Sequence, residues 1–199
     1  MYQKGNYTQA TNQSNHIEMS QYLATNYGST INSCKTLCEL GVGSGRNLFY
    51  LHESYPALKY SGNDINPNIH NEIRSIYPDV LEWASIEIVD TLTYLKKLQS
   101  PVDIFFTHGH LMHLPDDVIY EVCELISRKA NKYILIREAF LNGRGISLRH
   151  KKKYKDYRFD RDYENMFPGF SLEEKSITDH PTKKGIRYCI YLFKKQIHE

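Results

Sequence analysis

Three histidines lie close together at residues 107–113, in the segment T-H-G-H-L-M-H. They directly follow the apolar run of residues 102–106. Neutral imidazole is the commonest protein ligand of zinc, so metal binding is the first chemistry that this spacing suggests. A histidine at the end of a strand can also act as a general base or donate a hydrogen bond to a substrate. The surrounding sequence favours the second kind of chemistry.

The metal interpretation fails on the neighbouring residues. The segment is similar to T-H-x-H-x-D-H of the metallo-β-lactamase-like hydrolases, but Met112 stands where those enzymes carry the aspartate of their second metal site. The later histidines, His150, His180 and His198, come without a pattern of acidic ligands. We therefore predict that the protein binds no metal.

Length and composition indicate one globular domain over residues 1–199, because a chain of this size can bury a sizeable core without disulfides. Its four cysteines lie inside apolar patterns, which predicts buried thiols in a reducing compartment. The formal net charge of +2 implies no general attraction to nucleic acid or membrane. No apolar run is long enough to span a membrane, and residues 1–6 lack a secretory core. These features predict a cytoplasmic protein.

Strand and helix patterns alternate along most of the chain. Such alternation predicts an α/β fold, a doubly wound and mostly parallel sheet covered by helices. The last two strands are separated by a short loop, which predicts an antiparallel hairpin at the carboxyl end of the chain. Residues 1–30 read as an N-terminal arm. The predicted strands are 36–40, 58–63, 85–89, 102–107, 133–136, 172–178 and 186–193, and the predicted helices 46–55, 66–77, 91–98 and 115–129.

A glycine-rich turn follows the first predicted strand, where open parallel sheets bind their ligands. Its sequence is E-L-G-V-G-S-G, with the spacing G-x-G-x-G and with Arg46 at the third glycine of the dinucleotide fingerprint. Glu39 precedes the turn and would repel a pyrophosphate, whereas it suits a ligand that carries an ammonium and a sulfonium.

Acidic residues end the next two strands. Asp64 closes the second strand, where a carboxylate can accept both hydroxyls of a ribose, or can cap the helix that follows. Asp90 follows the third strand, where it can accept a hydrogen bond from an adenine amine, or can be the N-cap of the next short helix.

The chain resembles the class I S-adenosylmethionine-dependent methyltransferases in residues 39–47 (E-L-G-V-G-S-G-R-N), 63–67 (N-D-I-N-P) and 105–115 (F-F-T-H-G-H-L-M-H-L-P). This resemblance implies a Rossmann-like, seven-stranded sheet and S-adenosyl-L-methionine as the cofactor. The implied cofactor-binding residues are Tyr7, Glu39, Gly41, Gly43, Asn47, Asp64, Ile65, Asp90, Thr91 and Thr107.

A narrower resemblance is to the methylases associated with pseudaminic-acid biosynthesis. Residues 5–12 are similar to the G-x-x-Y-x-x-R-N motif of those methylases, with a shifted spacing and without the arginine. The segment R-F-D-R-D-Y at residues 158–163 is similar to a later part of that family. The resemblance implies a sugar or glycan precursor as the methyl acceptor.

Methyl transfer to an oxygen or nitrogen of a small molecule requires little acid–base help, because the sulfonium already activates the methyl carbon. His108 is the candidate base or acceptor-orienting donor, and His110 is a second candidate in the pocket. His113 fits a structural role. Two other activities use a similar fold: an RNA methyltransferase, and a nucleotide-binding oxidoreductase, against which Glu39 and the glycine spacing argue. A binding protein that holds the cofactor without turnover is a further alternative.

A basic segment at residues 143–168 follows the fifth strand and is predicted to form a substrate flap. Residues 143–161 carry a net charge of +6, which leaves −4 for the rest of the chain. This charge predicts an anionic small-molecule acceptor; a solvated loop is the alternative, and interleaved aromatic residues could also hold RNA. The sequence does not indicate the oligomeric state. With His108, the candidate substrate-binding residues are Arg144, Arg149, Tyr154 and Arg158.

Overall fold

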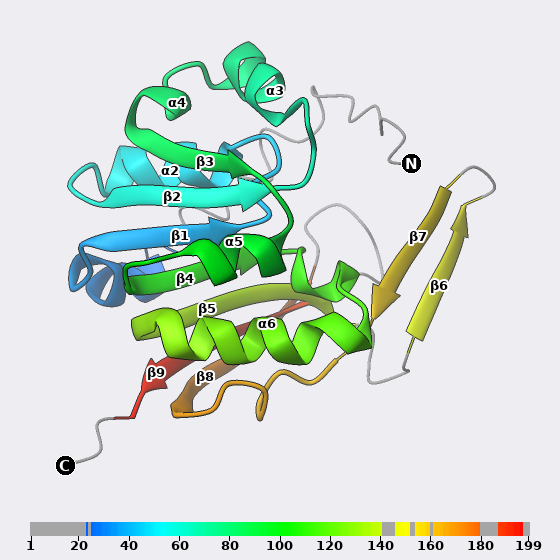
Figure 1. Cartoon of the computed structure of the whole chain (residues 1–199). Helices are drawn as coiled ribbons and strands as arrows, with labels where there is room; N and C mark the ends of the chain where they lie inside the picture. Colours follow the sequence, from blue (N-terminus) through cyan, green and yellow to red (C-terminus); the bar gives the residue numbers. More distant parts are fainter. Residues whose placement is uncertain are drawn as a thin grey trace. The chain divides into compact units, whose positions relative to one another are not determined.

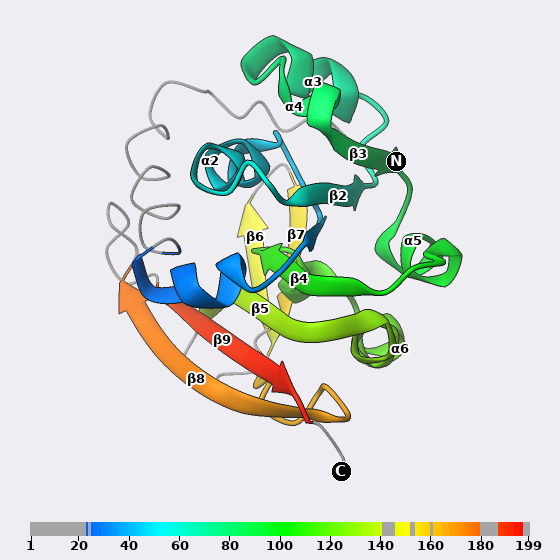
Figure 2. The same ribbon diagram turned by 90° about the vertical axis from the view of Figure 1, so that its left-hand side faces the viewer.

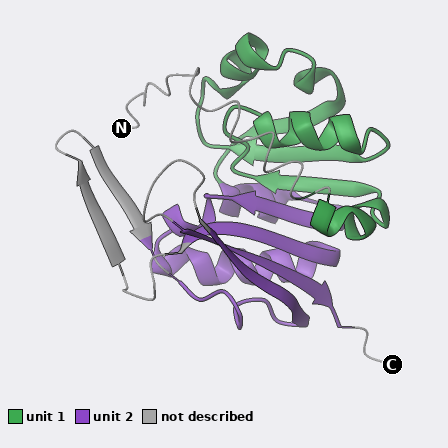
Figure 3. Ribbon diagram, turned by 180° about the vertical axis from the view of Figure 1, so that it is seen from behind, with its two compact units in different colours: residues 1–90 green, residues 91–199 purple. Residues whose placement is uncertain are grey.

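The computed structural model describes residues 23, 25–140, 146–151, 154–159, 161–179 and 187–196. Of residues 140, 146–151, 154–158 and 179 it describes only the backbone. Figure 1 shows the order of the elements along the chain. The chain divides into two compact units, residues 1–90 and 91–199, which Figure 3 colours separately.

The first unit contains three parallel strands in the order β3-β2-β1. In the register of β1 and β2, Glu39 lies opposite Gly62. Residues 25–32, which begin within the predicted N-terminal arm and extend two residues beyond it, are helical. The elements of this unit are β1 (Thr36–Leu40), α2 (Arg46–Ser54), β2 (Lys59–Asp64), α3 (Ile69–Ile76), α4 (Val80–Trp83) and β3 (Ala84–Ile88).

Local sequence explains where these helices begin and end. The helix α2 starts after Gly45, which has a left-handed φ of 77°, and stops before Pro56, whose ring disfavours a helical conformation in the preceding residue. The helix α3 begins three residues later than predicted, because Asn66 forms a turn: its side chain accepts a hydrogen bond from Asn68 N (3.0 Å). The one-turn helix α4 was not predicted, since four residues are too few to show helical periodicity.

The second unit contains four strands in the order β4-β5-β9-β8. The pair β4–β5 is parallel, while β9 runs antiparallel to both β5 and β8. Figure 2 shows α5 and α6 on the same side of β4 and β5. The elements are α5 (Thr91–Lys97), β4 (Val102–His108), the 3₁₀ helix η2 (Leu111–His113), α6 (Asp116–Lys129), β5 (Ala130–Phe140), β8 (Phe170–Asp179) and β9 (Arg187–Lys195).

The predicted fold class is confirmed, including the antiparallel hairpin β8–β9 and the parallel strands that precede it. For the basic segment at residues 143–168, the sequence analysis did not predict any strands. The basic segment contains a second hairpin of β6 (Ile146–Lys151) and β7 (Tyr154–Phe159), which forms its own two-stranded sheet. Its lysine-rich sequence lacks the apolar alternation by which strands are recognised.

The core explains the apolar patterns of the sequence. All residues of β4 from Val102 to Thr107 are buried, as expected for a strand with both faces covered. The cysteines Cys34, Cys38, Cys123 and Cys189 are buried and free, as predicted. Within the described ranges, no helix is long and apolar enough to cross a membrane.

Candidate active site

The glycine turn after β1 is held by the end of β2. The backbone nitrogens of Gly41 and Val42 both donate to Asn63 O, each at 3.0 Å. Gly41, Gly43 and Gly45 have φ of 73°, 51° and 77°, a left-handed conformation that favours glycine. Among the described residues, no atom lies within 4 Å of a Cβ built on Gly43, so the backbone here is open to a ligand.

Asp64 joins the turn to the loop after β2. Its Oδ2 accepts a hydrogen bond from Gly43 N (2.9 Å), and its Oδ1 accepts one from Asn66 N (2.9 Å). The side chain therefore stabilises the local turn as a cap would. It also lies beside the glycine backbone, and its contact with a ribose stays a prediction.

Glu39 is a buried carboxyl group whose two oxygens differ. Its Oε1 accepts a hydrogen bond from Asn47 Nδ2 (2.6 Å), whereas Oε2 is buried and has no hydrogen-bond partner among the described residues. Burial raises the pKa of Glu39 to about 8, which the Asn47 hydrogen bond and the charge of Arg46 oppose in part, while Asp64 raises it further. A cationic ligand that reached Oε2 would satisfy this atom and favour the ionised carboxylate.

Gly62 is a feature of this site that the sequence analysis missed. A Cβ at this position would lie 2.4 Å from Glu39 O and 2.5 Å from Val42 Cγ1. The strand β2 therefore passes so close to the carboxyl end of β1 that only glycine fits. An isolated glycine inside a strand pattern signals such close approach.

Two predicted cofactor residues follow β2 and β3 in the chain. Ile65 is half exposed (50%), and its apolar side chain follows Asp64 directly. Asp90 is exposed after β3, next to Val89, whose carbonyl accepts a hydrogen bond from Asn63 Nδ2 (3.0 Å). An exposed apolar side chain and an exposed acid at these positions suit the face and the amine of an adenine.

In the second unit, residues 107–113 form what we call the histidine loop. His108 ends β4, and its Nε2 is hydrogen bonded to the guanidinium of Arg137 on β5. Because arginine only donates, Nε2 is the acceptor, and a neutral His108 ring carries its proton on Nδ1. The Arg137 guanidinium also lies 3.8 Å from the centre of the Tyr188 ring on β9. His108, Arg137 and Tyr188 thus form one cluster at the end of these strands.

His110 has a different environment. Its Nε2 is hydrogen bonded to Thr91 Oγ1 at 2.7 Å, which joins the histidine loop to the first residue of α5. Burial of the ring lowers the pKa of His110 to about 4, and His113 lowers it further by charge repulsion. His110 is therefore neutral at pH 7.

Glu138 on β5 organises the histidine loop and was not recognised in the sequence. Its Oε1 accepts hydrogen bonds from Thr107 Oγ1 (3.1 Å), His110 N (3.0 Å) and Leu111 N (3.0 Å), and its Oε2 accepts one from Met112 N (3.3 Å). Burial raises the pKa of Glu138 to about 7, against the lowering effect of these donors. Thr107, predicted to contact the cofactor, thus directs its hydroxyl at Glu138.

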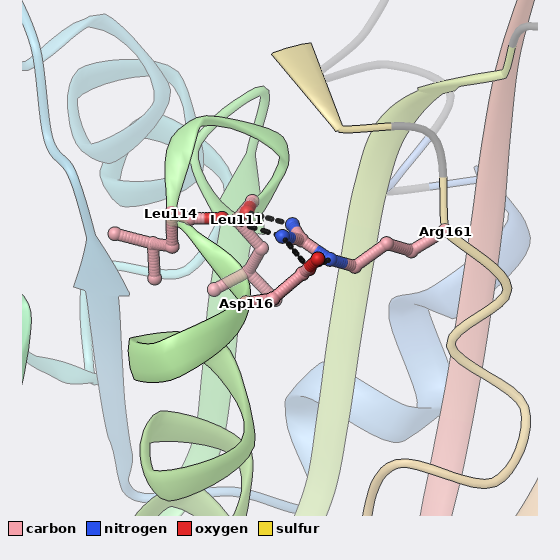
Figure 4. Close-up of polar contacts among 4 residues, drawn as sticks. All are labelled: Leu111, Leu114, Asp116 and Arg161. Atoms are coloured by element: carbon pink, nitrogen blue, oxygen red, sulfur yellow. Dashed lines mark hydrogen bonds and ion pairs between the residues drawn. The ribbon is translucent and has the colours of Figure 1, made fainter. Parts of the chain in front are cut away.

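Arg161 holds the other end of the loop (Figure 4). Its guanidinium donates to Leu111 O (3.3 Å) and Leu114 O (2.7 Å), and twice to Asp116 Oδ1 (3.1 and 2.6 Å). The Arg161 Cζ atom also lies 4.4 Å from the centre of the Phe159 ring. The end of the basic segment is therefore tied to the histidine loop and to the start of α6.

The structure brings several predicted residues into direct contact within each unit: Glu39 with Asn47, Gly43 with Asp64, and Thr91 with His110. His113 is exposed in η2. Among the residues whose side chains are described, no group of three potential metal ligands is present. Tyr7 and Arg144 lie outside the described residues, as do the side chains of Arg149, Tyr154 and Arg158.

No protein-family model matches the sequence, and no curated protein sequence matches it. Solved structures do match the fold. Magnesium protoporphyrin IX methyltransferase from Synechocystis, with bound S-adenosylhomocysteine, aligns with 98% of this chain and 90% of its own at a TM-score of 0.70 and 16% identity. The 1,6-didemethyltoxoflavin-N1-methyltransferase of Burkholderia thailandensis aligns with 94% of this chain and 80% of its own, at a TM-score of 0.69 and 14% identity. An O-methyltransferase from a trans-AT PKS multienzyme of Brevibacillus brevis aligns with 90% of this chain and 72% of its own, at a TM-score of 0.65 and 14% identity.

The chain therefore has the Rossmann-like fold of the class I methyltransferases. Its residues also fit the cofactor of that fold. The buried Glu39 Oε2 lacks a partner that a cationic amino-acid group can provide, the backbone at Gly43 is open, and Asp64 adjoins it.

Proposed function

We propose that the protein is an S-adenosyl-L-methionine-dependent methyltransferase that acts on an oxygen or nitrogen of a small molecule. The observation that carries this proposal is the buried Glu39 carboxyl, whose Oε2 has no partner in the described part of the chain, beside the open turn at Gly43. An ammonium or sulfonium beside Oε2 would favour the ionised carboxylate and be attracted to it, whereas a dinucleotide pyrophosphate would oppose that ionisation.

In this proposal, most cofactor contacts are assigned to chemical groups of the first unit. Glu39 holds the amino-acid end, the backbone of Gly41 and Gly43 approaches the ligand closely, and Asp64 accepts the ribose hydroxyls. Ile65 packs against the adenine, whose amine donates to Asp90. The remaining expected contacts are those of Tyr7, Asn47, Thr91 and Thr107.

The bound cofactor supplies an activated methyl group, so the protein's contribution is alignment of the acceptor and exclusion of water. His110 is neutral at pH 7 and is a weak base, because its pKa is lowered to about 4. His108 directs its Nε2 at a permanently charged arginine, which opposes protonation at that nitrogen. We therefore assign both histidines to orienting the acceptor through hydrogen bonds, a role that does not require proton transfer.

The identity of the acceptor is a finer part of the proposal. The net charge of +6 over residues 143–161 supports an anionic acceptor, held by Arg144, Arg149, Tyr154 and Arg158 in the basic flap. The narrower resemblance of residues 5–12 and 158–163 supports a sugar or glycan precursor.

Calorimetric titration with S-adenosylhomocysteine tests the cofactor. We expect micromolar binding by the wild type and no binding of NAD. Asp64→Ala should weaken binding by about 1–3 kcal/mol, because charge-assisted hydrogen bonds to the ribose are lost. Asp79→Ala is the matched control, since Asp79 is exposed in the same unit and its side chain makes no capping hydrogen bond.

Absence of S-adenosylhomocysteine binding by the folded wild type would refute the proposal, and NAD binding in its place would identify an oxidoreductase. Affinity for RNA that falls steeply with salt would instead replace the small-molecule acceptor with a nucleic acid.

A further inference from the structure

The start of the short helix η2 presents three consecutive backbone N–H groups to one carboxyl group. His110 N, Leu111 N and Met112 N all donate to Glu138, at 3.0, 3.0 and 3.3 Å. The first N–H groups of a helix have no backbone acceptor within it, so they need an outside partner. Here that partner is a side chain from the neighbouring strand, 26 to 28 residues further along the chain.

The geometry of the strands explains why one residue can do this. In the β4–β5 register His108 lies opposite Arg137, and their side chains meet on one face. Thr107, which precedes His108, and Glu138, which follows Arg137, meet on the opposite face. Gly109 N still donates to Arg137 O (2.8 Å), and its left-handed φ of 66° then turns the chain toward Glu138. Glu138 therefore receives the loop immediately after the turn.

The carboxyl end of the same short helix is also fixed by a charged side chain. Arg161 donates to the carbonyl oxygens of Leu111 and Leu114. An acidic group at the amino end and a basic group at the carboxyl end both match the helix dipole. The conformation of the histidine loop is thus determined by two residues outside it.

We infer that Glu138 is the positioning residue of the proposed acceptor site: its carboxylate fixes the backbone of residues 110–112 and thereby holds the His110 ring against Thr91. This role rests on the proposed function only in that the loop faces the acceptor. A carboxylate is needed rather than a carboxamide, because all four bonded groups are donors and Glu138 must accept from each of them.

Glu138→Gln tests the inference, since glutamine has the same shape but can accept on one side only. Whichever way the amide is oriented, its NH₂ group faces at least one donor. We expect the backbone of the loop to shift and the hydrogen bond between His110 and Thr91 to weaken. The readout is the ring signals of His110 in ¹H–¹⁵N NMR spectra recorded against pH, assigned by comparison with His110→Gln.

In the wild type, we expect the His110 ring to stay neutral down to about pH 5. In Glu138→Gln, its titration should move up by at least one pH unit as the ring becomes exposed. Ser127→Ala is the matched control: it removes another buried hydrogen bond of this unit, from Ser127 Oγ to Cys123 O (2.8 Å), and should leave the His110 titration unchanged.

An unchanged His110 titration in folded Glu138→Gln would overturn the inference. If the variant does not fold, amide hydrogen exchange of the wild type gives the decision. Protection of the amides of residues 110–112 is expected, and exchange at the rate of an unstructured chain would overturn the role of Glu138. Neither readout involves the cofactor, so a wild type that does not bind S-adenosylhomocysteine would refute the proposed function and leave this result intact.

Discussion

Replacement of Glu39 by glutamine should reverse its effect on stability between acidic and alkaline pH. The folded protein holds this carboxyl group fully buried, and its pKa is raised from 4.5 to about 8. Between these two values, the folded state keeps a proton that the unfolded state has released. The contribution of Glu39 to the free energy of unfolding therefore decreases as the pH rises from 4.5 to 8. Above pH 8 the full loss of stability from ionising the buried carboxyl group is present.

The magnitude follows from the shift, since one pKa unit corresponds to about 1.4 kcal/mol. The shift from 4.5 to about 8 amounts to about 5 kcal/mol above pH 8, as an order of magnitude. Glutamine is neutral throughout and can still accept from Asn47 Nδ2, but its NH₂ group then lies where Oε2 has no partner. That unsatisfied amide costs about 1–3 kcal/mol. Glu39→Gln should therefore be less stable than the wild type at pH 5 and more stable, by roughly 2–4 kcal/mol, at pH 8.5.

Urea unfolding followed by tryptophan fluorescence measures this difference. Trp83 is the single tryptophan of the chain and lies in the same unit as Glu39, stacked on His52 with a ring separation of 4.0 Å. Glu87→Gln, an exposed position on β3, is the control for the loss of one acidic side chain. Parallel pH profiles for wild type and Glu39→Gln would refute the raised pKa and the reasoning built on it.

The same group predicts a proton linkage in ligand binding. At pH 7 the buried carboxyl is largely protonated, so a cationic group placed at Oε2 should expel close to one proton. Titration of the wild type with S-adenosylhomocysteine in buffers of different ionisation enthalpy measures that number. Glu39→Gln should bind more weakly and release no proton from this position. Binding without proton release by the wild type would place the ammonium away from Glu39.

Two further predictions concern residues that support the glycine turn and the histidine loop. Gly62→Ala should unfold the first unit or destabilise it by more than about 2 kcal/mol, because the new Cβ would lie 2.4 Å from the backbone oxygen of Glu39. The control Gly169→Ala, at a φ of 77° with open space among the described residues, should cost only about 1–2 kcal/mol. Equal losses of stability in urea unfolding would contradict the close approach of β1 and β2. Arg161→Lys should destabilise the second unit by about 1–3 kcal/mol, because an ammonium cannot reproduce the forked guanidinium that contacts Leu111 O, Leu114 O and Asp116. Amide hydrogen exchange at residues 111–116 should accelerate in this variant. Unchanged exchange would show that the guanidinium is dispensable.

The sequence predicted the fold well because its signals were local. Alternating strand and helix patterns predicted the order of the main elements. The hairpin β6–β7 was missed since its lysines break the alternation on which strand prediction depends. Glu39 and Asp64 were found because both adjoin a glycine turn of recognisable spacing.

Glu138, Arg161 and Gly62 were harder to find, because each acts on a distant segment. Glu138 binds residues up to 31 positions away, and Arg161 binds residues 45 to 50 positions away. Such pairs leave no periodicity in a single sequence. Only Gly62 gave a signal, as a glycine within a strand, and that signal does not reveal which backbone it approaches.

Glu39 and Glu138 show why burial of a carboxyl group does not by itself indicate function. Both are buried at the carboxyl ends of strands, and burial raises the pKa of each, to about 8 and about 7. Glu138 accepts four hydrogen bonds from its own chain, so both of its oxygens are directed at the histidine loop. Glu39 accepts one from Asn47, and its Oε2 has no partner. A buried acceptor without a partner costs stability, and a fold can retain it where a ligand supplies the missing donor. The difference in hydrogen bonding assigns ligand binding to Glu39 and positioning to Glu138, and the two glutamine variants should separate accordingly: Glu39→Gln should change the affinity for S-adenosylhomocysteine, and Glu138→Gln the titration of His110.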